Sequence, residues 1–397
     1  MSFIKSIPDE PLGETKYLGI SSTCNTIVDY IQSKIIVTPM SIAIHGQWGS
    51  GKTNLLKALE KQLDPQKIKV VYFDAWKHES GNPSVALAGK IMKDLYGTGD
   101  VINNVIKVAA DALIRKTLDM NMSEIISIVQ DGIDSSEYLS QTLEKKIAQN
   151  IGKNKKLVVL IDDLDRCDIE NTLQILSMLK LFLDVKNCIC VAAIDFHRVE
   201  QAWFSKYSIK EGEESKLKKE GRQYLEKIFQ IRIPIPHPEY SQKHEYLTSL
   251  MPGVSNQYLE SLVEYGPSNP RSIKRMINLI SYRTFLVSSK DAEMISLLWT
   301  LMEENLSTQI LINFYDILES NGGFIVLLND HAENPQAIYS HFQNMNRKNI
   351  PSQFEDLDYA MKYFKTISLL MNSLTEPLGS LLRDFSRLYS ASKQLEN

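Results

Sequence analysis

The stretch Ser41-Ile-Ala-Ile-His-Gly-Gln-Trp-Gly-Ser-Gly-Lys-Thr53 decides the fold of this 397-residue chain. Its apolar first half is typical of a short buried strand, and its second half, Gly46–Thr53, matches the phosphate-binding pattern G-x-x-x-x-G-K-[ST]. The leucines that follow are spaced as on one face of a helix. Glycines let the backbone curl so that its N–H groups point inward, and a helix N-terminus adds partial positive charge there. The stretch therefore predicts a phosphate-binding loop, or P-loop, between a strand and a helix.

The chemistry of this loop predicts that it binds a nucleoside triphosphate, ATP, together with Mg²⁺. Lys52 can reach the β- and γ-phosphates, and the Thr53 hydroxyl can ligate the cation. We expect nucleotide contacts along the whole loop, from Gly46, Gln47, Trp48, Gly49, Ser50, Gly51, Lys52, Thr53 and Asn54. Trp48 is more typical of a packing residue here than of a base-stacking one. The alternative is a chance match to a glycine-rich turn.

Four further short apolar runs predict the remaining strands. They are rich in Val and Ile with little alternation, which is typical of strands buried on both faces of a parallel sheet. The runs are Lys69–Phe73, Leu157–Ile161, Ile189–Ile194 and Phe229–Ile235. Helical patterns lie between them, so the order indicates an α/β fold, a mostly parallel five-stranded sheet flanked by helices. Trp76, which follows the second predicted strand, is expected in the core.

The chain divides into three predicted parts. Residues 1–236 form the P-loop core, with a mostly helical insert at residues 84–152 that is too long for a simple crossover. Beyond this core the strand signal fades, and successive amphipathic helices predict an all-α C-terminal region. This region comprises a helical lid at residues 237–290 and an α-helical domain of unknown role at residues 291–397.

A group of acids follows the third predicted strand, where Leu157–Ile161 runs directly into Asp162-Asp-Leu-Asp-Arg166. Ligands of α/β sheets bind at the carboxyl ends of the strands. Asp162 is therefore a candidate metal ligand for Mg²⁺, and Asp163 a candidate catalytic residue that polarises the attacking water. The alternative is helix capping, which aspartates after strands often provide. For Asp165 the two interpretations are evenly balanced.

Arg166 and Lys52 complete the candidate catalytic set with Asp163. Arg166 could act as an arginine finger on the γ-phosphate of a neighbouring subunit. It could equally form a local ion pair with an acid of the same segment, at position 163, 165 or 168, and we favour this interpretation.

Two further residues are predicted to contact the nucleotide. Asp195 ends the strand Ile189–Ile194 and could sense the γ-phosphate through water or Mg²⁺, although capping a helix near His197 would also explain it. Arg271 lies with Lys274 and Arg275 at helical spacing, a cationic face that could close over the triphosphate. A solvated basic face or a contact with nucleic-acid phosphates is the alternative.

Composition narrows the class of protein. Apolar residues make up 43% and charged residues 23% of the chain, as in ordinary soluble globular proteins, and a formal net charge of −4 argues against a dedicated nucleic-acid binder. The four cysteines form no CxxC pair, which indicates reduced thiols rather than a metal site. No run approaches the roughly 18 apolar residues of a membrane helix. We therefore expect a cytoplasmic protein with no integral membrane segment.

Several motifs together resemble the KAP family of P-loop NTPases, over roughly residues 8–285. The carrying segments are Gly46–Thr53, Val71-Tyr-Phe-Asp-Ala-Trp76, Asp162-Asp-Leu-Asp-Arg-Cys167, Tyr224-Leu-Glu-Lys-Ile-Phe-Gln230 and Asn269-Pro-Arg-Ser-Ile-Lys-Arg-Met-Ile-Asn278. The resemblance implies an additional-strand ATPase akin to AAA+ and signalling NTPases, with a helical lid. It also implies that Asp162 is the Walker B acid and Asp163 the catalytic acid.

Many KAP members carry transmembrane helices between the two Walker motifs, but the insert at residues 84–152 is soluble in composition. Bacterial relatives are often linked to phage exclusion and defence. The function we expect is ATP hydrolysis that drives a switch or motor, assembled as a homo-oligomer or with an effector protein. Two alternatives are a nucleotide-dependent scaffold that does not hydrolyse ATP and a DNA-associated AAA+-like ATPase. The second would use the cationic face around Arg271 and the mixed-charge run at residues 206–223.

Overall fold

The computed structural model describes residues 4–10, 16–78, 83–96, 155–182, 185–199, 222–223, 225–288, 290–305, 356–375 and 383–391, with a few single positions between 336 and 343. Most of the predicted insert and nearly all of the mixed-charge run lie outside these ranges. The chain separates into two compact units. One comprises residues 11–236, and the other joins residues 1–10 to residues 237–397, so the chain passes between the units twice.

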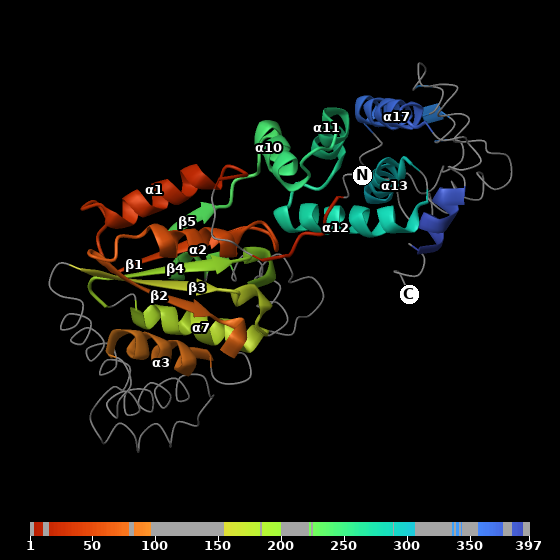
Figure 1. Ribbon diagram of the computed structural model, residues 1–397. Helices are drawn as coiled ribbons and strands as arrows, with labels where there is room; N and C mark the ends of the chain where they lie inside the picture. Colours follow the sequence, from red (N-terminus) through yellow and green to blue (C-terminus); the bar gives the residue numbers. More distant parts are fainter. Residues whose placement is uncertain are drawn as a thin grey trace, which may run out of the picture. The chain divides into compact units, whose positions relative to one another are not determined.

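The first unit is built on a five-stranded sheet in which every pairing is parallel (Figure 1). The strands are β1 (Met40–His45), β2 (Ile68–Asp74), β3 (Lys156–Asp162), β4 (Cys188–Ile194) and β5 (Ile231–Pro234), in the order β2-β3-β4-β1-β5. The additional strand β4 thus lies between the strand that leads into the P-loop and the strand that ends in acids. The predicted α/β P-loop NTPase fold is confirmed.

Helices cover both faces of this sheet (Figure 1). The helices are α1 (Ile20–Gln32) and α2 (Lys52–Gln62) on one face and α3 (Pro83–Tyr96) and α7 (Ile169–Phe182) on the other. Alternate residues of the central strands face opposite layers: Val158 and Leu160 pack with α1 and α2, whereas Val159 and Ile161 pack with α3 and α7. Burial on both sides is the reason that these strands are continuous apolar runs.

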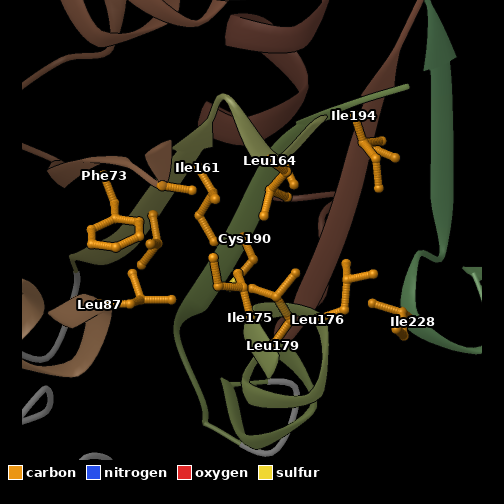
Figure 2. Close-up of a cluster of buried hydrophobic side chains, with 14 of the residues drawn as sticks. Phe73, Leu87, Ile161, Leu164, Ile175, Leu176, Leu179, Cys190, Ile194 and Ile228 are labelled. Atoms are coloured by element: carbon orange, nitrogen blue, oxygen red, sulfur yellow. The ribbon is translucent and has the colours of Figure 1, made fainter. Parts of the chain in front are cut away.

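Leu164 follows β3 and belongs to the hydrophobic core between the sheet and the helices α3 and α7 (Figure 2). Its side chain is fully buried and belongs to the same hydrophobic cluster as Ile161, Leu176 and Ile194. This burial fixes the segment in which the acids lie, because Leu164 sits in the middle of them.

The second unit is helical throughout its longer described segments. Its helices include α10 (Tyr240–Leu250), α11 (Asn256–Tyr265), α12 (Pro270–Leu286), α13 (Ala292–Asn305) and α17 (Leu357–Asn372). Local chemistry sets the start of α12, since the Asn269 side chain accepts hydrogen bonds from the backbone N–H groups of Arg271 and Ser272, and Pro270 occupies the first turn. Trp299 and Tyr363 are fully buried between these helices. The predicted all-α C-terminal region is confirmed for the described residues.

Residues 4–10 pack along α12 rather than on the sheet. Asn278 holds this segment with two hydrogen bonds: its Oδ1 accepts from Ile7 N at 2.6 Å, and its Nδ2 donates to Ile7 O at 2.9 Å. Ile4 is buried, and its N–H donates to Glu293. The N-terminal segment is therefore part of the helical unit.

Candidate nucleotide-binding site

The P-loop has the backbone geometry that its glycines predict. Gly51 has φ 102°, in the left-handed region, and a Cβ there would also lie 3.3 Å from Ile20 Cδ1. At Gly46 a Cβ would lie 2.6 Å from Ser50 Oγ and 3.3 Å from Ile235 Cβ, so a larger residue would require these side chains to shift. The helix α2 begins at Lys52, immediately after these turns. The N-terminus of α2 and the loop amides thus form one cradle of the kind that binds phosphate.

Lys52 lies across the loop with its ammonium group facing inward. Its Nζ donates to Gly46 O at 2.7 Å and to Gln47 O at 3.1 Å. It also lies 3.1 Å from Asp165 Oδ2, with both side chains almost completely buried. The lysine is therefore enclosed and held at the mouth of the phosphate cradle.

Thr53 and Asp162, the two candidate metal ligands, lie against each other. The Thr53 hydroxyl donates to Asp162 Oδ1 at 3.1 Å, and Asp162 is only 2% exposed. Burial raises the pKa of Asp162, while hydrogen bonds from Tyr72, the Asp163 N–H and Thr53 oppose the rise. Within the described residues, no group of three or more His, Cys, Asp or Glu side chains is arranged to hold a metal ion. A hydroxyl beside one carboxylate fits Mg²⁺, which usually takes few protein ligands and completes its shell with nucleotide phosphates and water.

Tyr72 is a site residue that the sequence pattern did not indicate. It lies on β2, next to β3 in the sheet, and its hydroxyl donates to Asp162 Oδ2. Burial, followed by the charge of Asp162, raises the pKa of Tyr72, so the hydroxyl stays protonated and donates. The sequence signal for this role is a tyrosine two positions before the aspartate that ends a strand. The signal alone does not identify a site residue, because the register of β2 against β3 decides that Tyr72 reaches Asp162.

Asp163 stands at the tip of β3 in a left-handed backbone conformation, with φ 56° and ψ 28°. Aspartate tolerates this region better than most residues. Burial and the neighbouring charge of Asp162 raise the pKa of Asp163 to about 6, and Arg166 opposes the rise. Arg166 Nε lies 3.0 Å from Asp163 Oδ1, and its guanidinium lies 5.1 Å from the ring centre of Trp76. Arg166 thus forms a local ion pair that fixes the direction of this carboxylate.

The expectation that Trp76 lies in the core was wrong, and the capping alternative for Asp165 does not hold. Trp76 is 50% exposed rather than in the core, and the Arg166 guanidinium lies over its ring. Asp165 does not cap the next helix, since Asp168 does so by accepting a hydrogen bond from Asn171 N at 2.7 Å. The carboxylate of Asp165 instead faces Lys52.

Acids at the ends of the neighbouring strands complete the sheet edge. Asp195 follows β4, and its Oδ1 accepts from His197 N at 3.1 Å, the geometry of a local cap. Asp74 is in register with Asp162 and forms an ion pair with Lys77 at 2.9 Å. Contact of Asp195 with a γ-phosphate stays a prediction.

Arg271 belongs to the other unit, where it contacts the N-terminal segment. Its Nε lies 2.7 Å from Asp9 Oδ2, and the neighbouring Lys274 donates to Pro8 O at 3.2 Å and to Glu10 O at 3.3 Å. Arg271 and Lys274, which the DNA-binding alternative would use, are thus engaged within the chain. A contact of Arg271 with the triphosphate also stays a prediction.

The described part of the chain contains no helix with the length and apolar character needed to cross a membrane.

A curated relative, the phage T7 exclusion protein of Escherichia coli strain K12, is 24% identical over 311 residues. The matched region covers 64% of this chain and 40% of that protein, so the chain spans less than half of its relative.

Two solved structures show more distant similarity. Cdc6p from Pyrobaculum aerophilum is 13% identical, with a TM-score of 0.47 and coverage of 97% of both chains. Domain III of the replication initiation protein DnaA from Thermotoga maritima is 14% identical, with a TM-score of 0.35 and coverage of 75% of this chain and 99% of that domain.

The sequence profile of the KAP family P-loop domain matches residues 20–287, more than half of the chain. The matched region contains the P-loop, the acidic end of β3 and the helices α10 to α12. The chain therefore belongs to the KAP family of P-loop NTPases.

Proposed function

We propose that the chain binds ATP with Mg²⁺ and hydrolyses it to ADP and phosphate. The observation that carries this proposal is the contact between Thr53 of the P-loop and Asp162 at the end of β3, which brings Lys52 and Asp163 to the same edge of the sheet. Phosphoryl transfer to water needs a phosphate cradle, ligands for the cation and a group that positions the water. The sheet edge supplies all three kinds of group.

The residues of the loop have separate tasks in this proposal. Loop amides and Lys52 bind the phosphates, and the positive end of α2 favours their charge. Thr53 and Asp162 hold Mg²⁺, which offsets the negative charge of the phosphate oxygens when bound. Tyr72 keeps Asp162 oriented by donating to its second oxygen.

Asp163 orients the attacking water and accepts its proton. The water oxygen bonds to the γ-phosphorus as the bond from that phosphorus to the β–γ bridging oxygen breaks, and ADP leaves with the bonding electrons. A pKa of about 6 leaves Asp163 mostly ionised at neutral pH and makes it a stronger base than an ordinary aspartate. Arg166 holds the carboxylate in one direction through their ion pair.

We infer further that hydrolysis drives a switch or motor, in an assembly of copies of this chain or with an effector protein. Antiviral defence is the setting that we propose, because the relative from Escherichia coli is a phage T7 exclusion protein. The shared region covers 40% of that protein, so the proposal concerns the ATPase part of such a system.

Phosphate release from ATP by the full chain, measured with and without Mg²⁺, tests the proposed activity. We expect Mg²⁺-dependent release by the wild type and only background release by Lys52→Ala. Lys61→Ala is the matched control, because Lys61 is exposed on the same helix and should leave turnover unchanged. A wild type that binds ATP but releases no more phosphate than Lys52→Ala would contradict hydrolysis and favour a nucleotide-dependent scaffold.

A further inference from the structure

The ion pair between Lys52 and Asp165 brings the P-loop lysine together with an acid that the mechanism above does not use. The two side chains are 7% and 4% exposed, and Nζ lies 3.1 Å from Oδ2. Lys52 also donates to two loop carbonyls, so three oxygens surround its ammonium group. A phosphate oxygen must therefore replace one of these partners before Lys52 can bind the nucleotide.

Asp165 is the partner that a phosphate oxygen can replace without breaking a well-aligned hydrogen bond. Its Oδ2 is buried and has no hydrogen-bond donor of good geometry among the described residues, so the contact with Lys52 is electrostatic without a well-aligned hydrogen bond. The two carbonyl contacts, by contrast, lie within the loop itself and are well-formed hydrogen bonds. Turning Lys52 from Asp165 towards a phosphate therefore keeps both hydrogen bonds of the loop but separates a buried ion pair.

The position of Asp165 is set by contacts that do not involve its carboxylate. On one side Leu164 is fully buried in the core, and Thr172 donates to its carbonyl at 3.0 Å. Arg198 Nη1 donates to the carbonyl of Asp165 at 2.7 Å. The backbone thus holds the carboxylate against the P-loop whether or not Lys52 faces it.

We propose that Asp165 competes with the nucleotide for Lys52 and thereby weakens nucleotide binding and promotes release of the product. The inference rests on the proposed nucleotide site. Once Lys52 has turned to the phosphates, Asp165 is a buried anion that has lost its cation and faces a second anion, and both effects oppose binding. Asp165 is in this sense a positioning residue that acts through Lys52.

Equilibrium binding of ATP and of ADP to the full chain, with Mg²⁺ present, tests this competition. Asp165→Asn is expected to bind both nucleotides about 10-fold more tightly than the wild type, within the usual range of coupling between two sites. The same variant should unfold at a lower temperature without nucleotide, since Lys52 loses its counter-charge. A residue with a merely structural role would lower stability without increasing affinity.

Asp168→Asn is the matched control, because it removes the same charge from the same segment while its carboxylate caps α7. Its affinity should match that of the wild type. If Asp165→Asn does not fold, Arg198→Ala provides the second test, since it frees the carbonyl of Asp165 and should increase affinity by a smaller factor. If the wild type binds nucleotide and a correctly folded variant binds it with equal or lower affinity, the proposed competition is overturned. If the wild type binds no nucleotide, the proposed nucleotide site is overturned as well.

Discussion

Replacement of Tyr72 by phenylalanine tests the metal site without touching a predicted ligand. The change removes one hydroxyl, whose hydrogen bond favours the ionised form of Asp162 and fixes its orientation. A hydrogen bond to a charged acceptor contributes about 1.5–3 kcal/mol, which corresponds to roughly 10- to 100-fold in an equilibrium constant. Loss of a residue that orients a metal ligand lowers metal affinity by about the same factor. We therefore expect the Mg²⁺ concentration for half-maximal hydrolysis to rise about 10- to 100-fold.

The assay is a titration of phosphate release with Mg²⁺ at saturating ATP. Tyr30→Phe makes the same chemical change on α1, in a tyrosine that is not a hydrogen-bond partner of Asp162, and should leave the midpoint unchanged. The maximal rate of Tyr72→Phe at high Mg²⁺ should remain near that of the wild type. A midpoint equal to that of the wild type would refute the role of Asp162 as the metal ligand that Tyr72 supports.

Three further predictions follow from the contacts of the acidic segment and the N-terminal segment. The hydrolysis rate should fall as the pH drops below about 6, because protonated Asp163 cannot accept the proton of water. In Arg166→Ala this fall should begin at a higher pH, since Arg166 lowers the pKa of Asp163. A pH–rate profile of the two proteins checks both expectations. Leu164→Ala should lower the free energy of unfolding by about 2–5 kcal/mol in denaturant titration, as at other fully buried leucines. Asp9→Asn should lower the free energy of unfolding by at most about 1 kcal/mol, because the Asp9 carboxylate is 48% exposed. Asn278→Ala should lower it by more, because this substitution removes two hydrogen bonds to Ile7.

The sheet and the P-loop could be predicted because their signals are local. Buried parallel strands are continuous apolar runs, and four of the five predicted runs both begin and end within one residue of the observed strands. The run Phe229–Ile235 was too long at its start, since β5 begins at Ile231. The left-handed turns of the P-loop could also be predicted from local sequence, because glycine has no Cβ and adopts a positive φ readily.

The partners of the charged side chains could not be predicted in this way. Lys52 and Asp165 are far apart in the sequence, and their meeting depends on the placement of β1 and β3 on either side of β4. The contact between Arg271 and Asp9 joins α12 to the N-terminal segment, which had been assigned to the P-loop core. Local patterns identify a charged residue as a candidate, whereas tertiary structure selects its partner.

Single-turnover hydrolysis of ATP by the wild type and by Asp163→Asn tests the central claim most directly, with nucleotide binding measured on the same samples. Asp163→Asn keeps the shape of the side chain and the phosphate cradle, but its amide cannot accept the proton of the attacking water. We predict that both proteins bind ATP with Mg²⁺ and that only the wild type converts it to ADP. Equal rates of conversion in the two proteins, or no conversion by a wild type that binds ATP, would contradict the account.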